Sequence, residues 1–571
     1  MQNWLKSTWR DLVLAAFVGL IIFIPRSTDL DRYVTIDEPA WLVYAGNFYY
    51  ALGQRDWPGT YQREHPAVTL SWIGAAGFLA EFPDYRGLGQ GQFDSFKKAS
   101  LFYRDNGVPP IDLIATSRLM LVIVNSLVLT LTFWVLKRLV GRWPALLGFT
   151  LLAFSPFHIA HIQIFHTDAL MGTFMFLALA AFLAYLLKGR NRSDLVIAGV
   201  ATGLAWLTKA PSAILLPIFG LILLLHEANK LRNGQERPTV MWAWRQLVTP
   251  LGIIVILAGL VFVTLFPAMW TDPLGTISQM FSKVGFYSES GGTGLRIFFN
   301  GEVVSHERPS LFFYPITYLW RSTPVTLIGV LLSGLFLLPV FRRNSEENTS
   351  HTVVFIWLYL LVFTIWLTLP ARMFDRYFHP FFGPAAFVAG VSWFALFRWL
   401  RAQSNLFMAR YAGAALLLFV VSIQVISTTN VYPYYLSHYN QMLGGQEKAQ
   451  DVMMIGWGDG LDLAADYLRE QPNAEEARIL TWYGTGSFSY FWFTEKTVTT
   501  LDMTWNEEYS NEYQNADYAI IYFQQIQREA PKTLLDFLNQ HEPEHTISIN
   551  GLDYIWIYNL KELPEPEFTS Q

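Results

Sequence analysis

Residues 166–192 read HTDALMGTFMFLALAAFLAYLLKGRNR, and this stretch decides the kind of fold to expect. Between Asp168 and Lys188 it holds no charged side chain, and about 20 consecutive apolar residues cross a hydrocarbon core as an α-helix. Basic residues in short loops stay in the cytoplasm, and Lys188, Arg190 and Arg192 follow the apolar run. The stretch therefore predicts a membrane span with a basic cytoplasmic end and an acidic external end.

Comparable apolar runs recur on both sides of this span along most of the chain. Only 15% of the residues are charged, against roughly a quarter in soluble domains, and 52% are hydrophobic. We therefore predict a mainly α-helical polytopic membrane protein with about eleven transmembrane helices. The predicted spans lie near residues 11–25, 116–136, 144–162, 169–187, 194–209, 211–226, 248–267, 323–341, 353–369, 379–397 and 411–428.

Basic residues mark every second connection between these spans. They are Lys137, Arg138 and Arg142; Lys188, Arg190 and Arg192; Lys230, Arg232 and Arg237; Arg342 and Arg343; and Arg398, Arg401 and Arg410. All of them fall on one side when the N-terminus is cytoplasmic and the number of spans is odd, which agrees with eleven spans. The start, MQNWLKSTWRDLVLAAFVGLIIFIP, lacks a small-residue cleavage site, so we expect a retained first span in a multi-pass protein of the cell membrane.

The part that follows the last predicted span has a different texture. It carries a helical pattern in GDGLDLAADYLREQ, strand patterns in ARILTWY, TVTTL and DYAIIYF, and a hairpin pattern in TISINGLDYIWIYNL. We predict a transmembrane domain over residues 1–428, with long external loops at 26–115 and 268–322. An extracytoplasmic α/β domain is predicted over residues 429–571.

Composition excludes several classes of function. The net charge of −5 and the isoelectric point near 6.1 lack the basic footprint of a nucleic-acid-binding domain, so no nucleic-acid partner is expected. Cysteine is absent, which excludes disulfide scaffolds, thiolate zinc sites and cysteine nucleophiles. Any chemistry must then use carboxylates, His, Lys, Arg, Tyr or hydroxyl groups.

Acidic residues at the external ends of spans are the first candidates for that chemistry, because ionisable groups near a membrane are costly and tend to mark sites. Asp37 and Glu38 directly follow the first span, where a carboxylate suits the role of general base on a hydroxyl. The alternative is that Asp37 caps the helix that begins at Pro39.

A second acidic candidate, Asp168, opens the fourth predicted span with His161 and His166 nearby. Together with Asp37, Glu38 and His65, these residues have the ligand types that bind a divalent metal, although no tight ligand motif is present. The alternative is a helix cap by Thr167 or Asp168.

Basic residues at the same external ends complete the candidate site. They are Arg118, Lys209, Arg372 and Arg376. Arginine and lysine at this depth bind phosphate through charge-assisted hydrogen bonds, whereas the alternative for each is that it snorkels toward the interface. Since acidic and basic residues from separate segments meet on one membrane face, the sequence predicts a site there.

Several segments at these positions carry a resemblance to a known family. They are IDEPAWLVYAGN (36–47), REHPAVTLSW (63–72), ATSRLMLVIVNSLVLTLT (115–132), SPFHIAHIQIFHTDALMGTF (155–174), GLAWLTKAPSAILLP (203–217), FFYPITYLWRSTPVTL (312–327) and RYFHPFFGP (376–384). From the first span to about residue 400 the chain resembles glycosyltransferase family 39, the protein O-mannosyltransferases and the lipid A aminoarabinose transferase.

This resemblance implies a C-type membrane glycosyltransferase fold and a donor sugar linked to polyprenyl phosphate. It implies that Asp37 is the catalytic base, that Glu38 helps to place a substrate and that Asp168 lies near the reaction centre. The predicted substrate-binding residues are His65, Arg118, His166, Lys209, Arg372, Arg376 and Tyr377. One departure is that the aminoarabinose transferases have a lysine before Pro-Pro where this chain has His65-Pro66-Ala67.

The resulting hypothesis is an inverting transfer of a hexosyl or pentosyl group from the lipid donor to a hydroxyl on protein, glycolipid or polysaccharide. The predicted transfer takes place among membrane lipids on the external face. It is predicted to require no cofactor, and a divalent metal is the alternative. GWGDGLDLAADYLRE is a recurring opening of the C-terminal extension in bacterial relatives, with no role assigned. The competing hypotheses are a secondary transporter or lipid flippase, and a noncatalytic surface-binding membrane protein.

Overall fold

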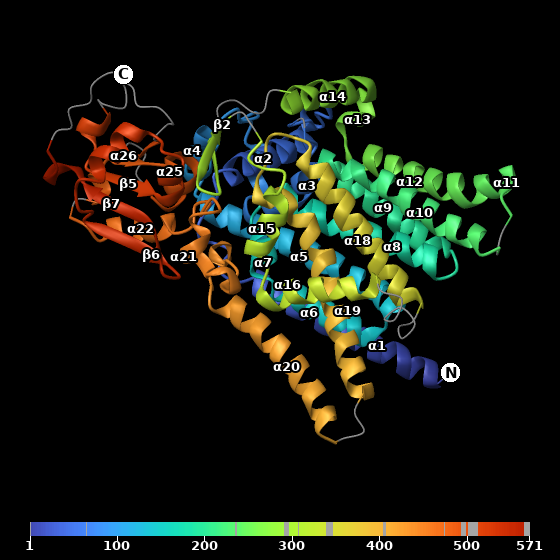
Figure 1. Cartoon of the computed structure of the whole chain (residues 1–571). Coiled ribbons are helices and arrows are strands. Elements are labelled where there is room, and N and C mark those ends of the chain that lie inside the picture. The colour runs from blue at the N-terminus through green and yellow to red at the C-terminus, as the bar shows by residue number, and fades with distance from the viewer. Residues whose placement is uncertain are drawn as a thin grey trace.

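The computed structural model describes residues 2–63, 65–234, 237–289, 296–305, 308–337, 347–403, 407–472, 474–492, 498–500 and 512–564. Helices dominate the chain as far as residue 429, and a five-stranded sheet follows in the part after it (Figure 1). This part, from residue 430 onward, is called the tail below.

The helices before the tail begin and end as follows. They are α1 (Gln2–Phe23), α2 (Glu38–Gln54), α3 (Val68–Glu81), α4 (Phe96–Asp105), α5 (Pro110–Val140), α6 (Arg142–Ala153), α7 (Pro156–Gln163), α8 (Thr167–Leu187), α9 (Arg192–Thr208), α10 (Leu215–Arg232), α11 (Val240–Ala243), α12 (Thr249–Leu265), α13 (Ala268–Thr271), α14 (Pro273–Glu289), α15 (Phe313–Arg321), α16 (Pro324–Ser333), α18 (Glu347–Thr368), α19 (His379–Gln403) and α20 (Phe407–Thr429). A two-stranded antiparallel hairpin, β1 (Arg296–Phe299) and β2 (Glu302–Ser305), interrupts this series.

Seven helices of the described part are long and apolar enough to cross a membrane, or eight if α6 and α7, which are bent by 65°, form one span. The seven are Pro110–Val140, Thr167–Leu187, Ala210–Arg232, Val240–Leu265, Asn348–Thr368, Asp375–Ala402 and Tyr411–Thr429. The other three predicted spans fall on α1, whose first half is polar, on α9 with 17 residues and on α16 with 10 residues. The end of the predicted span 323–341 lies outside the described residues. The predicted fold class, a mainly α-helical polytopic membrane protein, is confirmed.

Helix α8 forms the centre of the bundle. It is apolar on all sides and buried along almost its whole length, against α5, α9 and α19. Helices α6 and α19 cross so closely that a Cβ atom on Gly390 would lie 2.2 Å from the backbone nitrogen of Gly148. Small residues permit such close approach between apolar helices, and here they hold α19 against the bundle.

Ion pairs gather the predicted basic connections at one end of the bundle. Lys137 Nζ lies 3.0 Å from Asp11 Oδ2, and Arg138 Nη2 lies 2.5 Å from Asp194 Oδ1. Arg190 pairs with Glu227, which joins the connection after α8 to the last turns of α10. Because α8 runs from one end of the bundle to the other, these pairs lie at the opposite end from Asp168.

The tail contains a five-stranded mixed sheet with strand order β4-β3-β5-β7-β6. Its strands are β3 (Ile479–Thr481), β4 (Val498–Thr500), β5 (Tyr518–Tyr522), β6 (His545–Ile549) and β7 (Leu552–Asn559). Its helices are α21 (Gly445–Ala449), α22 (Leu461–Arg469), α23 (Ser489–Phe491), α25 (Phe523–Gln527) and α26 (Lys532–Leu538). The strand, helix and hairpin patterns found in the sequence each form the expected element.

The tail docks on the helical part through α2, α4 and α15, as the orange and red ribbon beside α4 shows in Figure 1. Ser487 Oγ donates to the backbone oxygen of Val34, just ahead of α2. Arg321 Nη1, at the end of α15, donates to the backbone oxygen of Leu436 at 2.6 Å. These buried hydrogen bonds place the tail directly over the helix ends that lie opposite the basic connections.

Candidate active site

Four charged residues from separate elements come together at the ends of helices. Asp37 directly precedes α2, and Asp168 lies in the first turn of α8, where the helix dipole favours a carboxylate. Lys209 directly follows α9, and Arg376 lies in the 3₁₀ turn Asp375–Phe378 before α19. The helix packing therefore brings together residues that are far apart in the sequence.

Arg376 joins the two carboxylates of this cluster. Its Nη2 donates to Asp37 Oδ2 at 3.0 Å, and its Nε lies 3.6 Å from Asp168 Oδ2. Lys209 Nζ donates to Asp168 Oδ1 at 2.6 Å. His166 lies between the acids, with Nε2 3.5 Å from Asp37 Oδ2 and Nδ1 3.2 Å from Asp168 Oδ2.

Asp37 is the more accessible of the two carboxylates, with a side chain that is 35% exposed against 2% for Asp168. Burial raises the pKa of Asp37, but the guanidinium of Arg376 and then His166 outweigh burial and lower that pKa well below its usual range. Both of these contacts use Oδ2, and among the residues described here Oδ1 accepts no hydrogen bond. The open oxygen of this ionised carboxylate is available to accept a proton.

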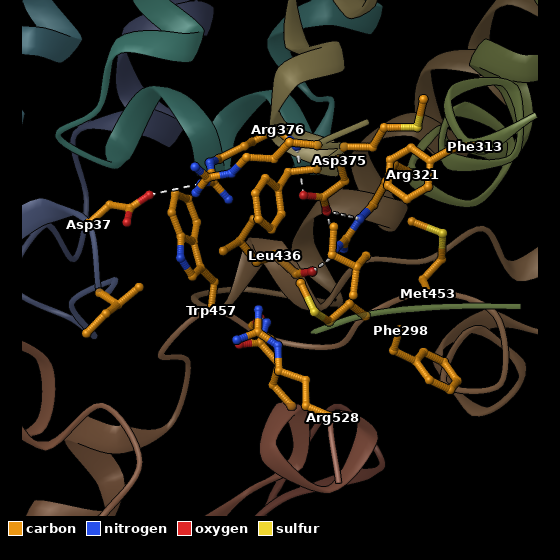
Figure 2. A pocket seen from close by; sticks show the side chains of 18 of the residues that line it. Asp37, Phe298, Phe313, Arg321, Asp375, Arg376, Leu436, Met453, Trp457 and Arg528 are labelled. Carbon is orange, nitrogen blue, oxygen red and sulfur yellow. Dashed lines mark hydrogen bonds and ion pairs between the residues drawn. The ribbon is translucent and has the colours of Figure 1, made fainter. Parts of the chain in front are cut away.

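Two cavities meet at this cluster. The helix-lined cavity has a volume of about 330 Å³, and its walls include Trp41, Tyr44, Arg63, His65, His166, Asp168, Lys209 and Tyr377. The tail-lined cavity has a volume of about 280 Å³, and its walls include Phe298, Arg321, Met453, Trp457, Gln524 and Arg528 (Figure 2). Asp37, Arg372 and Arg376 line both cavities, so they form the partition between them.

Most of the predicted substrate-binding residues line the helix-lined cavity. His65, His166, Lys209, Arg372 and Tyr377 are all among its wall residues. Lys209 Nζ lies 4.4 Å from the centroid of the Tyr377 ring, a distance that favours a cation–π interaction.

The tail places Trp457 beside the partition, on the side of the tail-lined cavity. The guanidinium carbon of Arg376 lies 4.5 Å from the centroid of the indole, which Figure 2 shows standing beside Arg376. The backbone nitrogen of Trp457 donates to Asp459 Oδ2 at 2.9 Å. Gly458 has a φ of +106°, and a Cβ atom there would lie 2.5 Å from the backbone oxygen of Val34. The GWGDG opening of the tail is therefore a tight loop that holds this indole against the site.

Glu38 and Arg118 lie elsewhere than the resemblance implies. They form a buried bidentate pair, with Arg118 Nε donating to Glu38 Oε1 at 2.7 Å and Nη2 lying 2.5 Å from Oε2. Glu38 also accepts from the backbone nitrogens of Phe165 and Thr35, at 2.7 and 2.9 Å. Neither residue lines either cavity, so the structure does not support direct contact with a substrate.

Contrary to the helix-cap alternatives, neither Asp37 nor Asp168 caps a helix with its side chain. Asp37 occupies the N-cap position of α2 but its side chain makes no capping hydrogen bond. At α8 the N-cap is His166 rather than Thr167 or Asp168, because His166 Nδ1 accepts from the backbone nitrogen of Asp168.

The possible metal site predicted from ligand types does not assemble around these residues. Within the described ranges no group of three or more His, Asp and Glu side chains is placed to hold one metal ion. His161 lines the tail-lined cavity, whereas His65 and His166 line the helix-lined one.

Sequence reasoning missed several wall residues. Arg63 is the first residue of the segment that suggested His65, and its guanidinium lies 5.3 Å from the centroid of the Tyr44 ring. Tyr44 lies two turns beyond Asp37 on α2, so helical spacing from a candidate base was a usable signal. Trp457 and Arg528 come from the tail, and nothing in the membrane segments points to them.

One comparison gives a family match over part of the chain. Residues 113–270 match the sequence model described as dolichyl-phosphate-mannose-protein mannosyltransferase. The predicted glycosyltransferase family is confirmed over this segment. The segment that this model matches contains Asp168 and Lys209, while folding brings Asp37 and Arg376 to it from outside. No curated protein matches the chain.

Solved structures resemble the chain over most of its length at low identity. ArnT from Cupriavidus metallidurans bound to undecaprenyl phosphate is 13% identical with a TM-score of 0.46, covering 97% of this chain and 98% of its own. The oligosaccharyltransferase AglB from Archaeoglobus fulgidus, in complex with an inhibitory peptide and a dolichol-phosphate, is 15% identical with a TM-score of 0.43, covering 92% of this chain and 70% of its own. At TM-scores below 0.5, neither structure assigns an activity to this chain.

Proposed function

We propose that this protein transfers a sugar from a polyprenyl-phosphate donor to a hydroxyl acceptor, with inversion and with Asp37 as the general base. The observation that carries the proposal is that one partly exposed carboxylate faces two cavities at once. A base that lies between a donor site and an acceptor site must be open to both. The matched family model, described as a dolichyl-phosphate-mannose-protein mannosyltransferase, agrees with this reaction class.

The helix-lined cavity is the proposed donor site. Its walls carry four cations, Arg63, Lys209, Arg372 and Arg376, against the two carboxylates Asp37 and Asp168. This excess of positive charge, inside a partly apolar space, suits a phosphate that is attached to a lipid chain. Trp41 and Tyr44 on α2 offer aromatic faces beside the phosphate-binding groups.

The reaction needs one proton acceptor and a place for the departing negative charge. The acceptor oxygen attacks the anomeric carbon and forms the new glycosidic bond, while its proton passes to Asp37 Oδ1. The bond from the anomeric carbon to the phosphate oxygen breaks, and its electron pair leaves with the lipid phosphate. Arg376 and Lys209 stabilise that charge, in a site where positioning and electrostatics supply most of the rate.

Glu38 and Arg118 act at a distance in this proposal. Their closed pair fixes the chain on both sides of Asp37, because Arg118 also donates to the backbone oxygens of Leu30 and Tyr33 at 2.8 and 2.9 Å. They are therefore positioning residues that hold the base in place.

The division of the chain and its orientation belong to the same proposal. Residues 1–428 form the transmembrane domain and residues 429–571 form an extracytoplasmic domain that lies over the site. The basic connections at the opposite end of the bundle would then be cytoplasmic, and the reaction would take place on the outer face of the cell membrane.

The experiment is a transfer assay with the full chain in lipid nanodiscs. Polyprenyl-phosphate sugars are supplied as a panel with hydroxyl acceptors, and the release of free lipid phosphate is measured. Replacing Asp37 with Asn is expected to lower turnover by at least about a hundredfold, the scale of general-base catalysis, and to leave thermal stability unchanged.

The matched control is Asp31→Asn, which removes an exposed carboxylate from the same loop and should keep full turnover. Near-normal turnover of Asp37→Asn with a proven donor would refute the assignment of the base. Movement of the intact donor across the bilayer without release of lipid phosphate would favour the flippase hypothesis instead.

A further inference from the structure

The tail-lined cavity has a charge excess that the proposed reaction does not use. Its walls carry Arg321, Arg372, Arg376 and Arg528 against Asp37 and Asp375. Arg376 pairs with Asp37, and Arg321 Nη2 lies 2.8 Å from Asp375 Oδ2. Arg372 also lines the donor cavity, so Arg528 is the cation that lines the tail-lined cavity alone and forms no ion pair among the described residues.

Arg528 is a buried cation without an acidic partner among the described residues. The residue is 6% exposed, its Nε has no hydrogen-bond partner, and no ion pair within the described part of the chain involves its guanidinium. Its backbone is held firmly, since its nitrogen donates to the oxygen of Gln524 at 3.1 Å and its oxygen accepts from Arg296 Nη1 at 3.2 Å. Burying an unpaired charge is costly, so the geometry leaves a place for an anion.

The neighbours of Arg528 do not fill that place. Arg528 directly follows α25, and Figure 2 shows its side chain in the cavity, below Trp457 and Leu436. Gln524 is already engaged, because its Oε1 accepts from Tyr483 and its Nε2 donates to the backbone oxygen of Gly456 at 2.9 Å. The described part of the chain therefore supplies no anion for Arg528, which leaves that place to a ligand.

We propose that the tail-lined cavity is the acceptor site and that it binds a hydroxyl compound carrying an anionic group, a phosphate or a carboxylate, which Arg528 holds. This inference rests on the proposed function only in naming the ligand an acceptor. The hydroxyl of the ligand faces Asp37 at the partition, and its anionic group lies against the tail. Apolar walls from Phe298, Met453 and Trp457 cover the part between them.

The probes are three small glycosides that share one ring and one alkyl chain. Hexyl glucoside is neutral, its 6-phosphate carries a phosphate, and hexyl glucuronide carries a carboxylate. Binding of each is measured by calorimetry to the full chain in nanodiscs of phosphatidylcholine, which adds no anionic lipid. The protein is expected to bind at least one anionic glycoside about tenfold or more tightly than the neutral one, the scale of a charge-assisted hydrogen bond.

Arg528→Gln should reduce that preference to about equal affinity for the three glycosides, and Arg528→Lys should keep part of it. The matched control Lys532→Gln removes an exposed cation, 4.0 Å from Glu529, and should keep the full preference. Comparison of the two anions shows whether phosphate or carboxylate is preferred, and competition by inorganic phosphate shows whether the site takes the anion alone.

Three outcomes would overturn the inference: equal affinity of the unmodified protein for all three glycosides, absence of binding, or a preference that survives in Arg528→Gln. Binding is read without turnover, so its result is separate from that of the transfer assay. If the protein prefers anionic glycosides but releases no lipid phosphate, the proposed function is rejected and the anion site stands. If it releases lipid phosphate but shows no anion preference, the proposed function stands and the anion site is rejected.

Discussion

Asp37 and Glu38 are consecutive residues, and each is paired with an arginine, yet the two pairs have opposite surroundings. The Glu38–Arg118 pair is fully enclosed, and both oxygens of Glu38 are used by the guanidinium and by backbone nitrogens. The Asp37–Arg376 pair stands between two cavities, and Asp37 keeps one oxygen open. The Glu38–Arg118 pair therefore stabilises the structure, whereas the carboxylate of the Asp37–Arg376 pair is available for reaction.

The difference comes from the rotation of one helix. Successive residues of an α-helix point about 100° apart, so the carboxylates at the start of α2 cannot face the same space. Glu38 points into the bundle, toward Arg118 on α5, and Asp37 is left at the partition. A carboxylate pair in the sequence thus supplies one anchor and one candidate base.

The largest expected effect comes from breaking the enclosed pair. Glu38→Ala leaves Arg118 buried with its carboxylate partner removed, which should lower the free energy of unfolding by about 3–5 kcal/mol. Thermal denaturation of the purified protein in nanodiscs measures this loss. Asp37→Asn serves as the contrast, because it should lose turnover and keep its melting temperature.

A different result for Glu38→Ala would contradict the distinction between the enclosed pair and the open pair. If Glu38→Ala keeps the melting temperature but loses turnover, Glu38 belongs to the reaction, as the family resemblance implies. The two carboxylates would then share one function despite their different surroundings.

A smaller effect is expected from loosening the open pair. Arg118 is held by Glu38 and by backbone oxygens, whereas Arg376 is held by carboxylates and by the face of Trp457. Trp457→Ala should therefore lower turnover about tenfold through loss of a cation–π contact, with little change in stability. Trp457→Phe should keep part of the rate because it keeps an aromatic face.

The control for this change is Trp143→Ala, which removes an indole that is 53% exposed and lines neither cavity. Measuring turnover at saturating donor separates poor positioning of Arg376 from weaker donor binding. Full turnover of Trp457→Ala would show that the tail does not help to hold Arg376.

Hydropathy and charge at helix ends carried much of the prediction. The apolar runs coincide with helices, and the residues picked at external ends, Asp37, Asp168, Lys209 and Arg376, do meet. This part was accessible because a membrane forces spans to be long and apolar, and costly charges to be few. Shorter helices such as α9 and α16 were harder, since packing within the bundle stabilises them without a full span.

The remaining features depend on tertiary packing. Whether Asp37 or Glu38 faces a cavity depends on how α2 is rotated against α5, which no local pattern encodes. Trp457 and Arg528 reach the site because the tail docks over the helix ends, and the sequence separation from Asp37 hides that contact. The three glycines of GWGDG, each with positive φ, were a local signal for a tight loop but not for its place.

The smallest expected effect concerns the pH dependence of the open pair. Arg376, then His166, outweighs the effect of burial and lowers the pKa of Asp37, so this carboxylate stays ionised as pH falls toward and below its usual range. Between about pH 7 and pH 5 the turnover of the unmodified protein should therefore show no loss that belongs to Asp37.

Removing the guanidinium of Arg376 should let the effect of burial on the pKa of Asp37 outweigh the effect of nearby positive charge. In Arg376→Gln the burial of Asp37 acts with only His166 against it, so its pKa should rise and the acid limb should move toward neutral pH. The pH profile of the residual turnover, at saturating donor, measures this shift. Suppose that the unmodified protein loses turnover near pH 6 and that Arg376→Gln loses turnover at the same pH. Another group would then titrate there, and Arg376 would not set the charge of Asp37. An upward shift of the acid limb in Arg376→Gln would show that Arg376 both neutralises the leaving phosphate and keeps the base ionised. The enclosed Arg118, by contrast, pairs with Glu38 and acts on no reacting group.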